Sequence, residues 1–176
     1  MRRLDLVHDC ARCASLCCVA TSFEASDDFA FDKPAGAACP HLGVDHLCTI
    51  HGSLVERGFR GCAAYGCHGA GQRATREHAA ALDGGARRSE AFLRLRVVHE
   101  LLWYLTEAAR LCPASHGDLR EAIAREVDAL DALAAEPRLF TEDLDERSAT
   151  AHALLRRVGD AVGGRGGLRP REAQGA

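Results

Sequence analysis

Eight of the nine cysteines in this 176-residue chain lie between residues 10 and 67. Four of them, Cys10, Cys13, Cys17 and Cys18, fall within nine residues. Free cysteines do occur in apolar cores. So dense a cluster is better explained by metal binding, because thiolates are good ligands for soft and borderline metal ions. The ninth cysteine, Cys112, lies on an apolar helical face, and we expect it to be an ordinary core residue.

The spacing of the first four cysteines indicates how they are shared. Cys10 and Cys13 form a Cys-x2-Cys pair, which presents two sulfurs to one ion. Cys17 and Cys18 are adjacent, so their side chains diverge and a single ion cannot take both without strain. We therefore expect one of them to complete the site begun by Cys10 and Cys13, and the other to face a second site.

Four further cysteines complete the candidate ligand set: Cys39, Cys48, Cys62 and Cys67. Eight thiols would fill two four-cysteine sites, or form one cluster with spare thiols. His51 lies three residues beyond Cys48 and is a candidate extra ligand. We expect the other histidines of this region to be solvated or hydrogen-bonded: His41, His46 and His68.

The N-terminus points to a reducing compartment. Two arginines open the chain, but no apolar run of 7–15 residues follows them, so we expect no secretory signal and a cytoplasmic location. The most apolar stretch, residues 97–105, is too short to span a bilayer, and we expect no membrane association. Thiols stay reduced in the cytosol, which favours metal or redox chemistry over a disulfide framework.

The fold class follows from a change in pattern near residue 70. Apolar residues recur at helical spacing in residues 89–112, in residues 115–136 and from about residue 141 onward, with Pro113 and Pro137 ending the first two helices. We predict a mainly α protein, in which an irregular, cysteine-rich, metal-stapled N-terminal half packs on a three-helix antiparallel bundle. The expected division is a metal-binding module over 1–70, the bundle over 71–163 and a disordered tail over 164–176.

Residues 68–85 join these two parts. We expect a short helix or lead-in there, ended by Gly84 and Gly85. The segment HGAGQ, directly after Cys67, has the composition of a turn that releases the chain into its helical half.

Several functions are compatible with clustered thiols. The first is a non-catalytic protein in which one or two cysteine-ligated zinc sites stabilise a module that binds a protein partner. The alternative is an iron–sulfur redox protein, or an iron-dependent modifying protein, that uses the same cysteines. Metal storage or delivery is a further option, whereas a thiol–disulfide enzyme would need a βαβ context that the sequence lacks. Catalytic residues of other kinds do not stand out, and the chain is not predicted to be an enzyme.

Charge argues against nucleic acid as a partner. Residues 1–67 carry six basic and eight acidic side chains, a net charge of −2 that does not suit a phosphate-binding face. The sequence suggests one modest basic patch, and we expect it to be a solvated surface. Its residues are Arg73, Arg76, Arg87 and Arg88.

The cysteine pattern resembles a known bacterial family. The segments CARCASLCC, ACPHL, CTIH and GC are similar to the CxxCxxCC (YkgJ-type) family, which is described as zinc- or iron-chelating. Three residues separate Cys13 from Cys17 where the family pattern has two, and His51 stands where Tyr is commoner. The resemblance implies the following ligands: Cys10, Cys13, Cys17, Cys18, Cys39, Cys48 and Cys62.

A second likeness covers roughly residues 10–160. The segments GFRGCAAYGCHGAGQ and VVHELLWYLTEA resemble the N-terminal cysteine-rich and helical module of certain bacterial pentapeptide-repeat proteins. This resemblance adds Cys67 to the implied ligands. The five-residue repeats themselves do not occur in the sequence, so no function that depends on them is implied.

Overall fold

The computed structural model describes residues 4–78, 85–135 and 137–163. The described residues form helices and loops without a β-strand, which confirms the predicted mainly α fold. Short helical turns occupy the N-terminal half: η1 (Cys10–Arg12), α1 (Leu16–Ala20), η2 (His51–Ser53) and α2 (Arg60–Ala64). Longer elements follow: α3 (Ala70–Glu77), α4 (Ala86–Leu111), α5 (Gly117–Ala135), η3 (Pro137–Phe140) and α6 (Leu144–Gly163).

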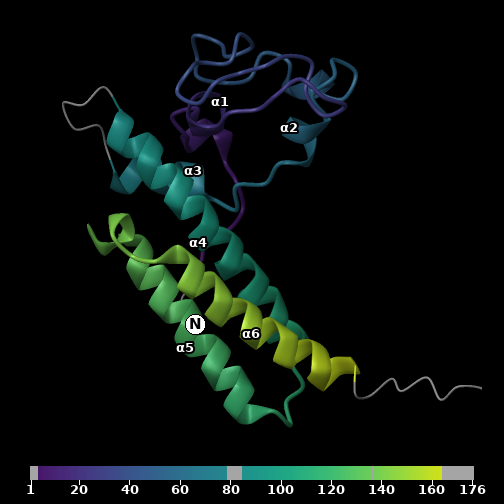
Figure 1. Ribbon diagram of the computed structural model, residues 1–176, viewed down its shortest axis with the longest axis vertical. Coiled ribbons are helices and arrows are strands. Elements are labelled where there is room, and N and C mark those ends of the chain that lie inside the picture. The colour runs from purple at the N-terminus through teal and green to yellow at the C-terminus, as the bar shows by residue number, and fades with distance from the viewer. Residues whose placement is uncertain (1–3, 79–84, 136, 164–176) are drawn as a thin grey trace, which may run out of the picture.

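The long helices α4, α5 and α6 form a bundle in which neighbours along the chain run in opposite directions (Figure 1). Each helix buries one apolar stripe, because residues three and four apart share a face. On α4 this stripe includes Phe92, Leu95 and Leu102, all of them fully buried. Ile123 and Leu130 of α5 meet it from the opposite side. The predicted bundle is thereby confirmed.

The helix starts differ from the sequence-based expectation. The apolar pattern predicted a start at residue 89 for the first long helix, but α4 begins at Ala86, after Gly85 in the left-handed conformation (φ +92°). The last helix begins at Leu144, because the Asp143 carboxylate accepts hydrogen bonds from the backbone N–H groups of Asp145 (3.0 Å) and Glu146 (3.2 Å). An N-cap of this kind fixes the first turn more firmly than the apolar pattern that pointed to residue 141.

The N-terminal half is irregular and carries a small core of its own. Between Thr21 and Phe59 it follows loops and turns, with isolated bridges pairing Phe23 with Lys33 and Leu42 with Cys48. Aromatic rings stack in its centre, the Phe23 and Phe29 centroids being 4.5 Å apart. This cluster is small, and its buried members are Ile50, Leu54 and Phe59.

The main core continues from the bundle into the cysteine-rich half. Leu16 and Ala20 of α1, and Ala70 and Ala74 of α3, belong to the same buried cluster as α4. Both short helices contact α4 directly. The predicted domain boundary near residue 70 therefore runs through one continuous core, and the predicted tail over 164–176 lies outside the described residues.

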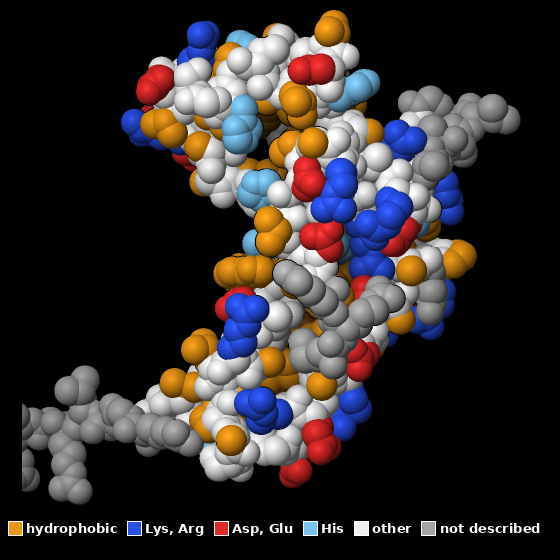
Figure 2. Space-filling model, turned by 180° about the vertical axis from the view of Figure 1, so that it is seen from behind, with side chains coloured by type: hydrophobic (Ala, Val, Ile, Leu, Met, Phe, Trp, Pro, Cys, Tyr) orange, Lys and Arg blue, Asp and Glu red, His pale blue; other side chains and the backbone are white. Residues whose placement is uncertain are grey.

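The surface carries charges of both signs. Figure 2 shows acidic and basic side chains interspersed on the face seen there. Arg73, which the sequence suggested for a solvated basic patch, is only 6% exposed. Its guanidinium is bonded to the carboxylates of Asp131 (2.7 Å) and Glu77 (2.8 Å), so α3 is tied to α5 by a buried ion pair. Within the described residues, every helix is too short or too polar to cross a bilayer.

Candidate metal centre

The structure brings the eight N-terminal cysteines into two neighbouring groups. In the first, here called the Cys10 group, Cys10 and Cys13 interact with Cys17 and Cys67. In the second, the Cys18 group, Cys18 interacts with three thiols contributed by two loops and by α2. These are Cys39, Cys48 and Cys62. Residues up to 57 positions apart in the sequence thus come together in the Cys10 group, and residues up to 44 positions apart in the Cys18 group.

The two groups meet at α1. Cys17 and Cys18 are neighbours on this helix, and their sulfur atoms lie 4.0 Å apart in hydrogen-bonding contact. Cys62 also interacts with Cys17, so the groups adjoin instead of standing apart. The Cys18 backbone carbonyl accepts a hydrogen bond from the Cys39 N–H group (2.9 Å), which fastens the incoming loop beside α1.

Burial controls the protonation of several of these thiols. It raises the pKa of Cys10, and the neighbouring cysteine charges of Cys17, Cys13 and Cys67 raise it further. The pKa of Cys17 is raised by its hydrogen bond with Cys18 and by burial, and the same hydrogen bond lowers the pKa of Cys18. Crowded thiols resist ionising together, and a bound cation would supply the charge that lets them do so.

Helix α3 provides the platform for the Cys10 group. A side chain at Gly71 would place its Cβ 2.7 Å from the Cys13 sulfur and 3.9 Å from that of Cys67. A larger residue at this position would force the Cys13 thiol to move, whereas the Cys67 sulfur would remain in ordinary contact. The Thr75 hydroxyl accepts a hydrogen bond from the Ala14 N–H group (2.9 Å) and also bonds to Cys13, where it opposes the effect of burial on the thiol pKa.

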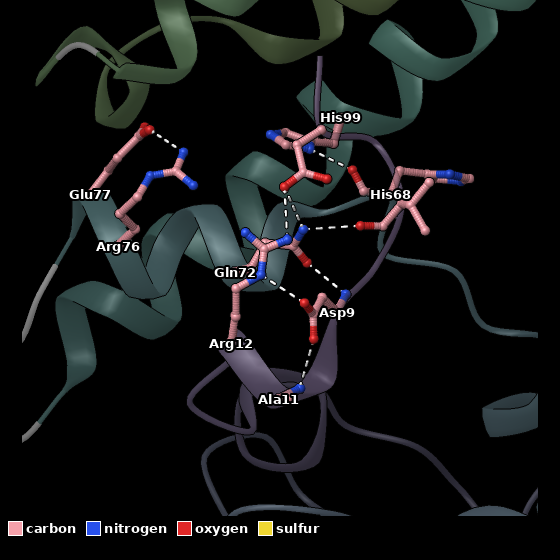
Figure 3. A network of polar contacts seen from close by, with 10 residues as sticks. Asp9, Ala11, Arg12, His68, Gln72, Arg76, Glu77 and His99 are labelled. Carbon is pink, nitrogen blue, oxygen red and sulfur yellow. Dashed lines mark hydrogen bonds and ion pairs between the residues drawn. The ribbon is translucent and has the colours of Figure 1, made fainter. Parts of the chain in front are cut away.

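Gln72 fastens the chain that leads into the Cys10 group (Figure 3). Its side-chain amide donates to the Asp5 carboxylate (3.1 Å) and the Val7 carbonyl (2.9 Å), and its oxygen accepts from the Asp9 N–H group (2.7 Å). Gly69 allows the Asp5 backbone to pass close by, since a Cβ there would lie 2.2 Å from the Asp5 carbonyl oxygen. The segment HGAGQ is therefore a docking element and more than a connecting turn.

Helix α4 holds the residue that follows Cys67. The buried His99 ring bonds through Nδ1 to the His68 carbonyl (2.6 Å), and because a carbonyl only accepts, Nδ1 carries the proton. Burial lowers the His99 pKa to about 4, and the nearby Arg73 charge lowers it as well. The His68 ring stacks on Trp103 with centroids 5.0 Å apart. His99 was not among the predicted site residues, because in the sequence it reads as part of an apolar helical run.

Two histidines of the N-terminal half have surroundings of their own, apart from the thiol groups. His41 stacks against Phe31 and Phe59 in the aromatic cluster. His51, the candidate extra ligand, is exposed at the start of η2. The residues that most affect the pKa values of Cys18 and Cys62 are other cysteines, and not His51. Cys112 is 3% exposed within the bundle core, as expected.

In the described part of the chain, no three Cys, His, Asp or Glu side chains yet stand as close together as a metal ion requires. The thiols form two loose groups, and ligation would draw each group together. The donor set nevertheless suits a thiophilic ion, because each group offers four sulfurs and Gly71 keeps the space beside Cys13 clear.

Comparison with known proteins gives one informative similarity. The chain is 37% identical over 166 residues to the uncharacterized protein YybG of Bacillus subtilis (strain 168). The match covers 90% of this chain and 59% of that protein, so the chain spans somewhat more than half of its relative. No known family profile matches the sequence. No solved structure matches it either.

Proposed function

We propose that the N-terminal half is a non-catalytic metal-binding module, in which cysteine-ligated zinc stabilises a surface that binds a protein partner. The observation that carries this proposal is the convergence of eight thiols from separate loops and short helices around α1. Eight convergent thiols suit two four-cysteine sites, and zinc prefers four thiolates in tetrahedral geometry. The resemblance to the CxxCxxCC family supports metal binding, by zinc or by iron.

The local contacts support a structural role for the ion. The N-terminal half has a small aromatic core, and long loops connect its ligands. A module of this kind gains much of its folding free energy from the metal, since a preformed site does not exist in the unfolded chain. When bound, zinc supplies a divalent charge that offsets the thiolates. The chain supplies the rest: α3 positions Cys13, and the Leu16 N–H group bonds to the Cys13 sulfur.

The cytoplasm is the compartment we propose, because eight ligand thiols must stay reduced. The partner is proposed to be a protein, since the N-terminal half carries more acidic than basic side chains.

The first test is metal analysis, together with an absorption spectrum, of the full chain purified without oxygen. Two zinc ions per chain in a colourless solution are expected. Iron with sulfide, and a brown solution, would favour the iron–sulfur alternative. The matched pair of variants is C13S, which should lose one ion, and C112A, which removes a buried cysteine outside both groups and should keep both ions.

Metal removal provides a second test on the same protein. Chelation is expected to make residues 10–67 sensitive to protease while α4, α5 and α6 keep their helical circular dichroism. Trp103 is the only tryptophan of the chain, and it stacks on the ring next to Cys67, so its fluorescence should change as the Cys10 group empties. Unchanged proteolysis and fluorescence after complete metal removal would contradict a structural role for the metal.

A further inference from the structure

The two thiol groups share a single turn of helix. We assign Cys17 to the Cys10 group, although Cys62 interacts with it as well, and Cys18 to the Cys18 group; their sulfurs lie 4.0 Å apart. A zinc–sulfur bond is about 2.3 Å long, so ions bound to these two sulfurs would lie no more than about 9 Å from each other. Independent structural zinc sites do not need such closeness.

We propose that the two groups hold their ions as one coupled pair astride α1, with the ammonium of Lys33 as the built-in counter-ion. This inference rests on the proposed function and deepens it. Each divalent ion with four thiolates carries a net charge of about −2. Two such centres within about 9 Å repel each other, and a buried charge of opposite sign reduces that repulsion.

Lys33 is placed to supply this charge. It is the only lysine of the chain, and it is 3% exposed. Its ammonium donates to backbone carbonyls on both sides of the Cys18 group. These belong to Val19, Thr21, Pro34 and Ala37. Within the described residues, no carboxylate bonds to this ammonium. Burial lowers the pKa of Lys33, whereas the nearby sulfurs of Cys39, Cys18 and Cys17 favour its charged form.

The carbonyl cage also joins two ligand-bearing segments. Val19 follows Cys18 directly, and Ala37 lies two residues before Cys39. Removing the ammonium would therefore release the loop that brings Cys39 to α1, and would leave the thiolate charge uncompensated. A solvent-exposed arginine in the same module cannot do this, because water screens its charge.

Cobalt(II) is the probe for the ion pair, because it is paramagnetic and takes tetrahedral thiolate sites. The full chain is loaded with cobalt and compared, by low-temperature electron paramagnetic resonance, with the C48S and C67S variants. Each variant leaves one complete four-thiol group. Two cobalt ions per wild-type chain, with a spectrum broadened relative to the sum of the two variant spectra, are expected.

Two ions per chain with a spectrum equal to that sum would overturn the coupled pair and leave the proposed function standing. One ion per chain would overturn the pair alone, and a chain that binds no ion would overturn the proposed function as well. The C112A variant serves as the control and should reproduce the wild-type spectrum.

The role of Lys33 is tested by K33M, which keeps the length of the stem and removes the charge. We expect cobalt affinity to fall at least tenfold at the Cys18 group, measured in the C67S background, and by a smaller factor at the Cys10 group, measured in the C48S background, because Cys39 and Cys18 act on the ammonium more strongly than Cys17 does. The control R57M removes one exposed positive charge, and the affinity at either group should stay within twofold. An equal loss at both groups, or an effect of K33M no larger than that of R57M, would overturn this role.

Discussion

Replacing Gly71 with alanine tests whether α3 shapes the Cys10 group. Gly→Ala inside a helix usually stabilises a protein by about 0.5–1 kcal/mol, because alanine loses less backbone entropy on folding. At Gly71 the added Cβ would lie 2.7 Å from the Cys13 sulfur, where ordinary contact needs about 3.5–4.0 Å. The thiol must therefore move by about 1 Å. Overpacking of this kind costs about 1–3 kcal/mol.

Gly159 provides the matched control. It lies on the exposed face of α6, and a Cβ added there would meet no atom within 4 Å. The free energy of unfolding in urea should therefore rise by about 0.5–1 kcal/mol in G159A. The free energy of unfolding should be about 1–3 kcal/mol lower in G71A than in G159A. This difference isolates the steric cost, because both variants gain the same backbone entropy term. Metal content should fall in G71A alone. Equal stability gains and equal metal content in the two variants would refute the reasoning.

Three further predictions concern the helical half. His99 is held neutral in the fold with a pKa of about 4, against 6.5 in the unfolded chain, so its contribution is complete above pH 6.5 and is lost as the pH falls toward 4. Between pH 7 and pH 5 wild type should lose about 2 kcal/mol more stability than H99Q, measured by urea unfolding at each pH, and parallel pH profiles would contradict this. R73M leaves the Asp131 and Glu77 carboxylates without their buried partner and should lower the free energy of unfolding by about 3–5 kcal/mol. R110M, at an exposed ion pair, should lower it by less than about 1 kcal/mol. Similar losses for the two variants in thermal or urea unfolding would contradict this. L95A removes a fully buried side chain and should cost about 2–5 kcal/mol, while the same change at the largely exposed Leu111 should have a small effect.

The bundle could be predicted because its signal is local. Leu95, Leu102 and Leu105 recur at helical spacing along one segment, and period alone places them on one buried face. Pro113 follows the end of α4, as its missing N–H group predicts. The first residue of each helix was harder to predict, because a cap such as Asp143 acts through one side chain and adds nothing to the apolar periodicity.

The platform beneath the Cys10 group could not be predicted in the same way. Gly69 and Gly71 of HGAGQ are compatible with a turn and equally with a close backbone approach, so the sequence does not distinguish between the two. Arg73 lies in a sequence context that is typical of a surface residue. In the fold, Asp131, which is 58 positions later in the chain, lies beside it and pairs with it. A buried ion pair between distant segments has no signature in either segment alone.

By itself, the sequence determined the class of this protein: a dense set of thiols in one half and amphipathic helices in the other. It also predicted that Cys17 and Cys18 would serve different ions, because adjacent side chains diverge. Only the tertiary structure decided which thiols gather around each of them, and that the two groups meet 4.0 Å apart on α1. The reason is physical. Spacing constrains neighbours along the chain, whereas the convergence of Cys39, Cys48 and Cys62 depends on how loops close, which packing and buried hydrogen bonds decide together.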